Sequence, residues 1–381
     1  MIFCRLHNGI DRPREGVVFN SEHVRSIDKD IVRASNLLEM GWRVAVDPST
    51  YKLQFREEYY AMLVDRDYFR SNVDPVQFYN PVFLTKFVED VLSFQKLFNP
   101  SIFISPYFFI DDIDCQYLDI NFNLFEEAKR QLSGSSIPLL FGLAISEKII
   151  QSPTKLNELL SQFMLYPSAS SYYLRAEMVK PNNKPCSNKR FLKGLRHLVS
   201  NITICKSLLL SQVDQSVLGL FSNGKLSVAI NPEASIRKND IEAKHNAEPS
   251  TGGPKAEDKR TWIYIPELLS DLDLQRDIRR TTGLKSFSHN TEITCKCKYC
   301  SVSKAGIDPL KLSKNRRSHF ILQFHKQVYS ILGSDNRVKA FEDMIEKAQR
   351  LFRLIDKENI ILDGENRGEF LEVWRDAFTS D

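Results

Sequence analysis

The amino-acid sequence predicts an α/β protein: a (β/α)8 TIM-like barrel with a C-terminal zinc-binding helical portion. Short apolar runs alternate with amphipathic stretches along most of the chain, and a cysteine cluster then interrupts this alternation near residue 295. Near-continuous apolar strands joined by helices are typical of a parallel sheet that is covered on both faces. Since about seven such units follow one another, we expect the sheet to close into a barrel.

The apolar runs and the amphipathic patterns define the elements that we expect. The predicted strands are residues 43–47, 101–105, 137–145, 171–177, 203–212, 216–221 and 261–265. The predicted helices are residues 119–132, 188–201, 315–332 and 335–355. Short, nearly continuous apolar runs indicate the strands, and amphipathic patterns indicate the helices.

Two breaks in the alternation indicate the domain organisation. Residues 232–260 are polar, contain Gly and Pro, and have almost no large apolar side chains, so we expect a mobile insertion there. From about residue 286 the pattern changes to cysteines and helices. We therefore predict a barrel over residues 1–285 and a zinc-binding helical portion over residues 286–381.

Composition narrows the class of protein. The chain has 381 residues, 42% of them hydrophobic, and a net charge of +4, which tolerates a nucleic-acid partner without requiring one. The polar start "MIFCRLHNGI" does not suit a signal peptide, and no apolar run reaches the roughly 18 residues of a membrane span. We expect a cytoplasmic protein with no membrane partner. No P-loop, Rossmann fingerprint, H-E-x-x-H or G-x-S-x-G motif supports nucleotide hydrolysis or serine-hydrolase chemistry.

The stretch "CKCKYC" places Cys295, Cys297 and Cys300 within six residues. Irregular cysteine spacing in a cytosolic chain indicates reduced thiols, and such a cluster is typical of a structural Zn²⁺ site with four tetrahedral ligands. Either His319 or His325, in "SHFILQFH", is placed to supply the fourth ligand. The alternative is three reduced thiols with no metal.

The cysteine spacing, together with His325, resembles that of the tRNA-guanine (queuine/archaeosine) transglycosylase superfamily. The stretches "VDPSTYK" (46–52) and "LLFGLAIS" (139–146) are similar to two further motifs of that family, so the resemblance spans roughly residues 40–330. It implies a (β/α)8 barrel with structural zinc, and exchange of a guanine-type base in tRNA. One branch of the superfamily inserts 7-deazaguanine bases into DNA.

Four carboxylates near strand ends are the candidate catalytic groups, because barrel enzymes carry their chemistry at the carboxyl ends of the strands. Under the resemblance, Asp47 is the family's first catalytic aspartate. The other candidates are Asp112, Glu177 and Asp214. Three of them have a specific structural alternative: a turn at Asp47-Pro48, a solvated loop at Asp112, and a buried pair between Arg175 and Glu177.

Nearby aromatic and polar side chains are candidates for substrate binding. Tyr107 and Phe108 precede Asp112 and are suited to stacking on a base, and Gln212 follows an apolar strand. A basic stretch beside the predicted zinc site is the candidate for binding a phosphate backbone; the alternative is a solvated helix face. Its residues are Lys311, Lys314, Arg316 and Arg317.

The sequence thus favours a divergent transglycosylase-like protein that exchanges a guanine-type base in tRNA or DNA with the help of carboxylates. Ile145 stands where the family has a base-reading glutamine, and residues 261–269 contain no aspartate at the place of the family's nucleophile. These departures favour the alternative, a catalytically inert zinc-stabilised barrel that binds nucleic acid or a protein partner. A homodimer or a multi-protein system fits either hypothesis.

Overall fold

The computed structural model describes most of the chain. The described residues are 2–5, 14–21, 24, 26–55, 63–69, 73–164, 166, 168–178, 185–222, 226–230, 262–273, 277, 309–360, 362 and 367–379. The predicted insertion at 232–260 and the cysteine cluster lie outside them.

The strands are mostly short and the helices connect them along the chain. The strands are β1 Ile2–Arg5, β2 Arg14–Asn20, β3 Arg43–Asp47, β4 Phe103–Ile104, β5 Phe109–Ile110, β6 Leu139–Ile145, β7 Ser171–Ala176, β8 Ser207–Val213, β9 Leu226–Ile230, β10 Trp262–Ile265 and β11 Ser270–Asp273. The helices are α1 Ile27–Glu39, α2 Pro81–Lys96, α3 Tyr117–Gln131, α4 Glu147–Gln151, α5 Pro153–Met164, α6 Lys189–Cys205, α9 Pro309–Leu332, α10 Arg337–Lys357 and α11 Phe370–Thr379. The 3-10 helices are η2 Thr50–Gln54, η5 Pro75–Tyr79, η6 Gln215–Ser222 and η9 Pro266–Leu268.

The main sheet has the strand order β3-β2-β1-β9-β8-β7-β6-β4, and β5 also pairs with β6. Strand β1 is antiparallel to β2 and β9, whereas the other neighbours are parallel. The sheet curves into a half-barrel, and one parallel bridge between Ala45 and Ile102 links β3 to the residues before β4. The α/β class is therefore confirmed; the described residues do not show the predicted closed eightfold barrel.

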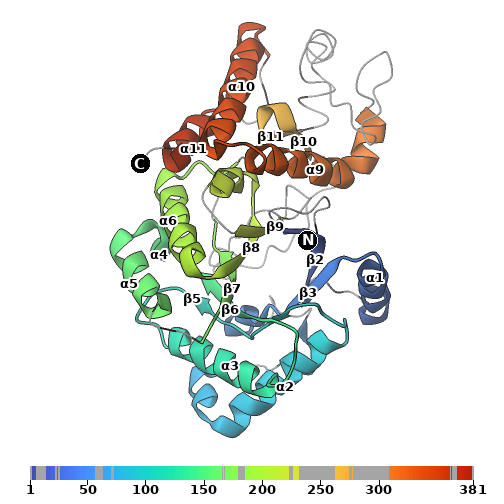
Figure 1. Cartoon of the computed structure of the whole chain (residues 1–381), viewed down its shortest axis with the longest axis vertical. Coiled ribbons are helices and arrows are strands. Elements are labelled where there is room, and N and C mark those ends of the chain that lie inside the picture. The colour runs from blue at the N-terminus through green and yellow to red at the C-terminus, as the bar shows by residue number, and fades with distance from the viewer. Residues whose placement is uncertain are drawn as a thin grey trace, which may run out of the picture.

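The two faces of the curved sheet carry different side chains because successive residues of a strand point to opposite faces. Val18, Ala45, Ile104 and Tyr173 pack together on the concave face. Neighbouring residues such as Val17 and Val44 pack in a second cluster with apolar side chains of α1 and α2. In Figure 1 helices α2 to α6 surround the strands on this outer side.

The C-terminal helices pack against α6, η6 and the hairpin of β10 and β11. Helix α11 contacts α6, and α9 contacts β10 and η6. Trp374 of α11 is buried, and its Nε1 donates a hydrogen bond to the carbonyl oxygen of Cys186 at 2.7 Å. Figure 1 shows α9, α10 and α11 at one end of the molecule, beyond α6 and β9. The predicted boundary at residue 285 falls outside the described residues and stays a prediction.

Most of the predicted elements in this part of the chain are present, and three differ. The predicted strand 216–221 is wrong, because these residues form the buried 3-10 helix η6. Residues 203–205, also predicted as strand, complete α6. The predicted strand 261–265 does form β10, but β10 pairs only with β11 in a separate antiparallel hairpin. A short buried apolar run fits a strand or a helix equally well, so periodicity alone does not separate them.

Among the described helices, none combines the length and apolar character that crossing a bilayer requires.

Candidate functional site

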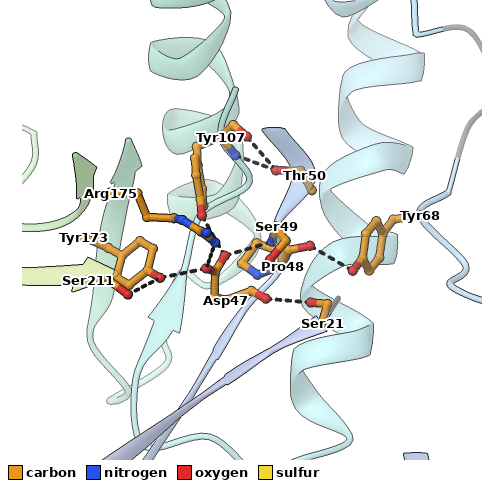
Figure 2. A network of polar contacts seen from close by, with 10 residues as sticks. All are labelled: Ser21, Asp47, Pro48, Ser49, Thr50, Tyr68, Tyr107, Tyr173, Arg175 and Ser211. Carbon is orange, nitrogen blue, oxygen red and sulfur yellow. Dashed lines mark hydrogen bonds and ion pairs between the residues drawn. The ribbon is translucent and has the colours of Figure 1, made fainter. Parts of the chain in front are cut away.

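The centre of the candidate site is Asp47, the last residue of β3. Alternation along β3 places Asp47 on the concave face with Ala45, and its side chain is 0% exposed. The site therefore lies at the carboxyl ends of the parallel strands, where the sequence predicted it. Figure 2 shows the polar side chains that converge on this carboxylate.

The Asp47 carboxylate accepts four hydrogen bonds. Its Oδ1 accepts from the backbone N–H of Ser49 at 2.8 Å and from the Tyr107 hydroxyl at 2.7 Å. Its Oδ2 accepts from the Tyr173 hydroxyl at 2.7 Å and from Nη1 of Arg175 at 2.8 Å. A carboxylate offers about four acceptor positions, so the protein itself uses all of them.

Arg175 gives this network its charge balance. The Arg175–Asp47 ion pair has side chains that are only 3% and 0% exposed, so the close pairing offsets part of the cost of burying the two charges. The Arg175 guanidinium also lies 4.6 Å from the centre of the Tyr51 ring, and that ring is stacked on Tyr107. A buried ion pair enclosed by aromatic rings therefore fills this end of the concave face.

Burial and the Asp47 charge determine the protonation of the two tyrosines. Burial, and then the negative charge of Asp47, raise the pKa of Tyr107 well above its ordinary value, and the same two causes raise the pKa of Tyr173. Both hydroxyls consequently keep their protons and act as donors to Asp47. The Tyr173 oxygen also lies 3.0 Å from the Ser211 hydroxyl, which brings β8 into the network.

Further hydrogen bonds hold the backbone around Asp47. The Ser21 hydroxyl donates to the Asp47 carbonyl at 2.6 Å, and the Tyr68 hydroxyl donates to the Pro48 carbonyl at 2.9 Å. Thr50 bonds both the N–H and the carbonyl of Tyr107 through its hydroxyl. Ser49 has a left-handed backbone with φ of 52°, a conformation that costs a non-glycine residue about 1 kcal/mol or more.

The structure places Asp112 away from this network. Its side chain is 48% exposed and forms an ion pair with Nζ of Lys155 at 2.5 Å. That hydrogen bond from Lys155 lowers the pKa of Asp112. Asp112 therefore fits the structural alternative to a catalytic role, which was a residue of a solvated acidic loop.

Glu177 and Asp214 are buried, but both bind backbone amides. Oε2 of Glu177 accepts from the Ser146 hydroxyl and from the N–H of Glu147, each at 3.2 Å, so it lies at the start of α4. Asp214 accepts from the N–H of Cys186 at 2.7 Å and from the N–H of Ser216 at 2.9 Å. These contacts are typical of carboxylates that hold loops and helix starts in place.

The three predicted substrate-binding residues have different surroundings. Tyr107 is part of the Asp47 network, whereas Phe108 packs in the helix-facing core against Phe78 and Phe87. Gln212 is buried and has a left-handed φ of 60°, within the irregularity that shifts the pairing of β8 with β9. The structure thus brings Tyr107 to Asp47 and separates Phe108 from it.

Sequence reasoning missed the partners of Asp47. It proposed Glu177 as the partner of Arg175, whereas Arg175 pairs with Asp47, which lies 128 positions earlier in the chain. Strand alternation puts Tyr173 and Arg175 on one face of β7. Asp47 becomes their partner only through the spatial neighbourhood of β3 and β7 on the concave face, which has no local signal in the sequence.

Of the predicted zinc ligands, the two histidines lie among the described residues. Nε2 of His319 lies 2.8 Å from the Tyr264 carbonyl, a contact that often orients a metal-bound imidazole. His325 is buried, and this burial lowers its pKa, which favours the neutral imidazole that a metal requires. Both residues therefore fit the role of fourth ligand. The described residues alone contain no group of three metal-binding side chains, and Cys295, Cys297 and Cys300 lie outside them.

The predicted basic surface lies on the first half of α9. Arg317 is exposed and Arg316 is half-buried. Lys311 and Lys314 belong to the same helix, and their side chains lie outside the described part.

No family model matches this sequence, and no curated protein matches it either.

Proposed function

We propose that the chain is a transglycosylase-like protein that binds nucleic acid without exchanging a base, and that the Asp47 network is a structural element of its barrel. The observation that supports this proposal is the saturation of the Asp47 carboxylate. Each acceptor position that a catalytic base or nucleophile would need is taken by a donor of the protein.

The energetics of the ion pair support the same proposal. A carboxylate that attacks a sugar carbon or removes a proton has to release some of its hydrogen-bond donors. Releasing Arg175 would break a buried ion pair, which costs about 3–5 kcal/mol. An Asp47 held in this way is suited to fixing β3 against β7.

We also propose that the sheet closes into a barrel and that the chain holds a structural zinc ion. The bridge between Ala45 and Ile102, together with the continuous packing of concave residues from β2 to β9, supports a closed barrel derived from the (β/α)8 type. The buried His319 and His325 support a structural zinc ion, held by one of these histidines together with the three clustered cysteines.

Nucleic acid is the favoured partner because Arg317 of the predicted basic surface is exposed on α9, the helix that carries His319 and His325. The experiment is fluorescence anisotropy with labelled tRNA and duplex DNA over a range of salt concentrations. We expect binding that weakens as salt rises, and we expect Arg317→Ala to reduce the salt slope by about one unit. Binding to neither polymer at low salt would contradict the proposal.

Base exchange by an active enzyme is the competing function. Two non-glycine residues with left-handed backbones, Ser49 and Gln212, lie at the strand ends near Asp47, and such strained residues are common at active sites. The decisive measurement is the uptake of labelled guanine into tRNA or DNA. Uptake by the wild type that is lost in Asp47→Asn would establish the enzyme and refute the inert barrel.

A further inference from the structure

The first half of α6 carries basic side chains on the face that points away from the core. Lys189, Lys193 and Arg196 recur at intervals of three or four residues, so they lie on the same face of the helix. Arg190 lies three positions before Lys193 and borders this face. The side chains of Lys189 and Lys193 are 55% and 46% exposed, and Arg190 is exposed as well. These four residues form the basic face of α6.

Helix α11 supplies the contacts of this basic face, and Figure 1 shows it beside α6. Lys189 and Lys193 both pair with the carboxylate of Asp376: Nζ of Lys189 contacts Oδ2, and Nζ of Lys193 lies 3.8 Å from Oδ1. Nη1 of Arg196 donates to the carbonyl oxygen of Ala377 at 3.3 Å, which is an uncharged acceptor. A single carboxylate is therefore shared by two ammonium groups and compensates them only in part.

Arg190 adds to the excess of positive charge on this face. Within the part of the chain that the structure describes, no carboxylate forms an ion pair with Arg190. Three exposed cations, Lys189, Arg190 and Lys193, thus stand against the one carboxylate that contacts them. A surface with such an excess of cations attracts ligands that carry several negative charges.

The ion pairs with Asp376 are exchangeable. Its side chain is 38% exposed and both lysine side chains are more exposed still, and exposed ion pairs contribute only about 0–1 kcal/mol. An incoming anion can therefore replace the carboxylate at little energetic cost. The docking of α11 does not depend on these pairs, because Trp374 and Phe378 bury the helix in the hydrophobic core.

We propose that the basic face of α6 binds the phosphate backbone of nucleic acid, and that Asp376 weakens this binding by competing with the phosphates for Lys189 and Lys193. Lysine binds phosphate as a point charge, so exposed side chains are sufficient and a cavity is not required. A polymer with one negative charge per nucleotide suits several cations along one helix. The inference rests on the proposed binding of nucleic acid, and it adds a second surface besides α9 and a residue that limits the affinity.

The test measures the binding of labelled tRNA and duplex DNA by fluorescence anisotropy over a range of salt concentrations. The double variant Lys189→Ala/Lys193→Ala should bind at least about fivefold more weakly, with a salt slope that is smaller by about two, because each lost phosphate contact lowers the slope by about one. Asp376→Asn should bind at least about threefold more tightly, because both ammonium groups become available to phosphate. A gain of affinity on removing Asp376 is a result that loss of structure does not produce.

Matched controls make the same changes of charge on α3 and α10. Lys129→Ala/Lys339→Ala removes two exposed lysines, and Asp343→Asn removes a carboxylate that pairs with Lys339 on the surface. Both should bind as the wild type does, and every variant should melt at the wild-type temperature. The inference alone is overturned if Arg317→Ala weakens binding but the double variant on α6 does not, or if Asp376→Asn binds no more tightly than Asp343→Asn. A wild type that binds neither polymer overturns both proposals.

Discussion

At the scale of single residues, the molecule is organised around the buried pair of Asp47 and Arg175. Placing two charges in a protein interior costs several kcal/mol for each, and only close pairing with further hydrogen bonds offsets this cost. Asp47 obtains these bonds from Ser49, Tyr107 and Tyr173. These contacts explain how Asp47, which the sequence motif singled out, is stable as a buried charged residue.

The first prediction concerns this pair. We expect Asp47→Asn to lower the free energy of unfolding by about 3–5 kcal/mol, because it removes one charge of a buried, hydrogen-bonded ion pair. Urea denaturation followed by circular dichroism measures the effect. Glu89→Gln, whose exposed carboxylate pairs with Lys86 on the surface of α2, is the control and should leave the unfolding midpoint unchanged. A loss below about 1 kcal/mol in Asp47→Asn, as for a surface pair, would show that the pair is dispensable.

The second prediction concerns the pH dependence of stability. In the folded protein the pKa values of Tyr107 and Tyr173 lie well above the ordinary 10.0, whereas in the unfolded chain they return to it. Their contribution is thus complete below pH 10.0 and decreases as the pH rises further, since only the unfolded state then releases the protons. We expect the free energy of unfolding to decrease above that pH. Tyr173→Phe should show a shallower decrease; an unchanged slope would argue against this assignment.

At the scale of elements, close backbone approach decides how the helices cover the sheet. Gly194 of α6 faces α4 at a distance that admits no side chain: an added Cβ would lie 1.8 Å from the carbonyl oxygen of Ile150. The amphipathic pattern of residues 188–201 predicted a helix, and α6 confirms it. The need for glycine comes from the neighbouring helix, and the sequence of α6 alone does not indicate it.

The third prediction follows from this contact. Gly194→Ala should destabilise the protein by about 1–3 kcal/mol or more, because the added methyl group forces α6 and α4 apart. Chemical denaturation measures the change. Lys193→Ala, next in the chain and with a side chain that is 46% exposed, provides the control. Equal stability of the two variants would mean that α4 moves aside without cost.

At the scale of the whole molecule, the C-terminal helices and the half-barrel share one hydrophobic core. The largest buried cluster includes Leu143 and Leu174 of the sheet, Leu195 of α6, and Phe352 and Trp374 of the C-terminal helices. The hydrogen bond from Trp374 to Cys186 joins positions 188 residues apart. The C-terminal portion is therefore part of the cooperative structure.

The fourth prediction concerns zinc. We expect about one equivalent of zinc per chain by elemental analysis of the purified protein, and loss of the metal in Cys295→Ser and Cys300→Ser. Comparison of His319→Ala with His325→Ala identifies the fourth ligand. Because a structural metal contributes to folding free energy, chelation should lower the melting temperature. Protein that is free of metal and unaffected by chelators would eliminate the zinc site.

The local patterns of the sequence were sufficient for much of the secondary structure and for the position of the site. Residues 43–47 form β3 as predicted, because a short apolar run is a local signal. Asp47 was singled out by the family resemblance and by its position at the end of that strand. Residues 216–221 were misassigned because a fully buried apolar segment lacks the periodicity that separates a strand from a helix.

Tertiary structure alone decided the chemical environment of these residues. Whether Asp47 is an exposed acid or a saturated acceptor depends on Tyr173 and Arg175 of β7 and on Tyr107, which lies between β4 and β5. The contact of α11 with α6, which brings Asp376 to two lysine side chains, likewise has no local signal. Periodicity and composition report which side of an element is buried. They do not report which distant side chain completes a hydrogen bond, since that depends on how the sheet curves.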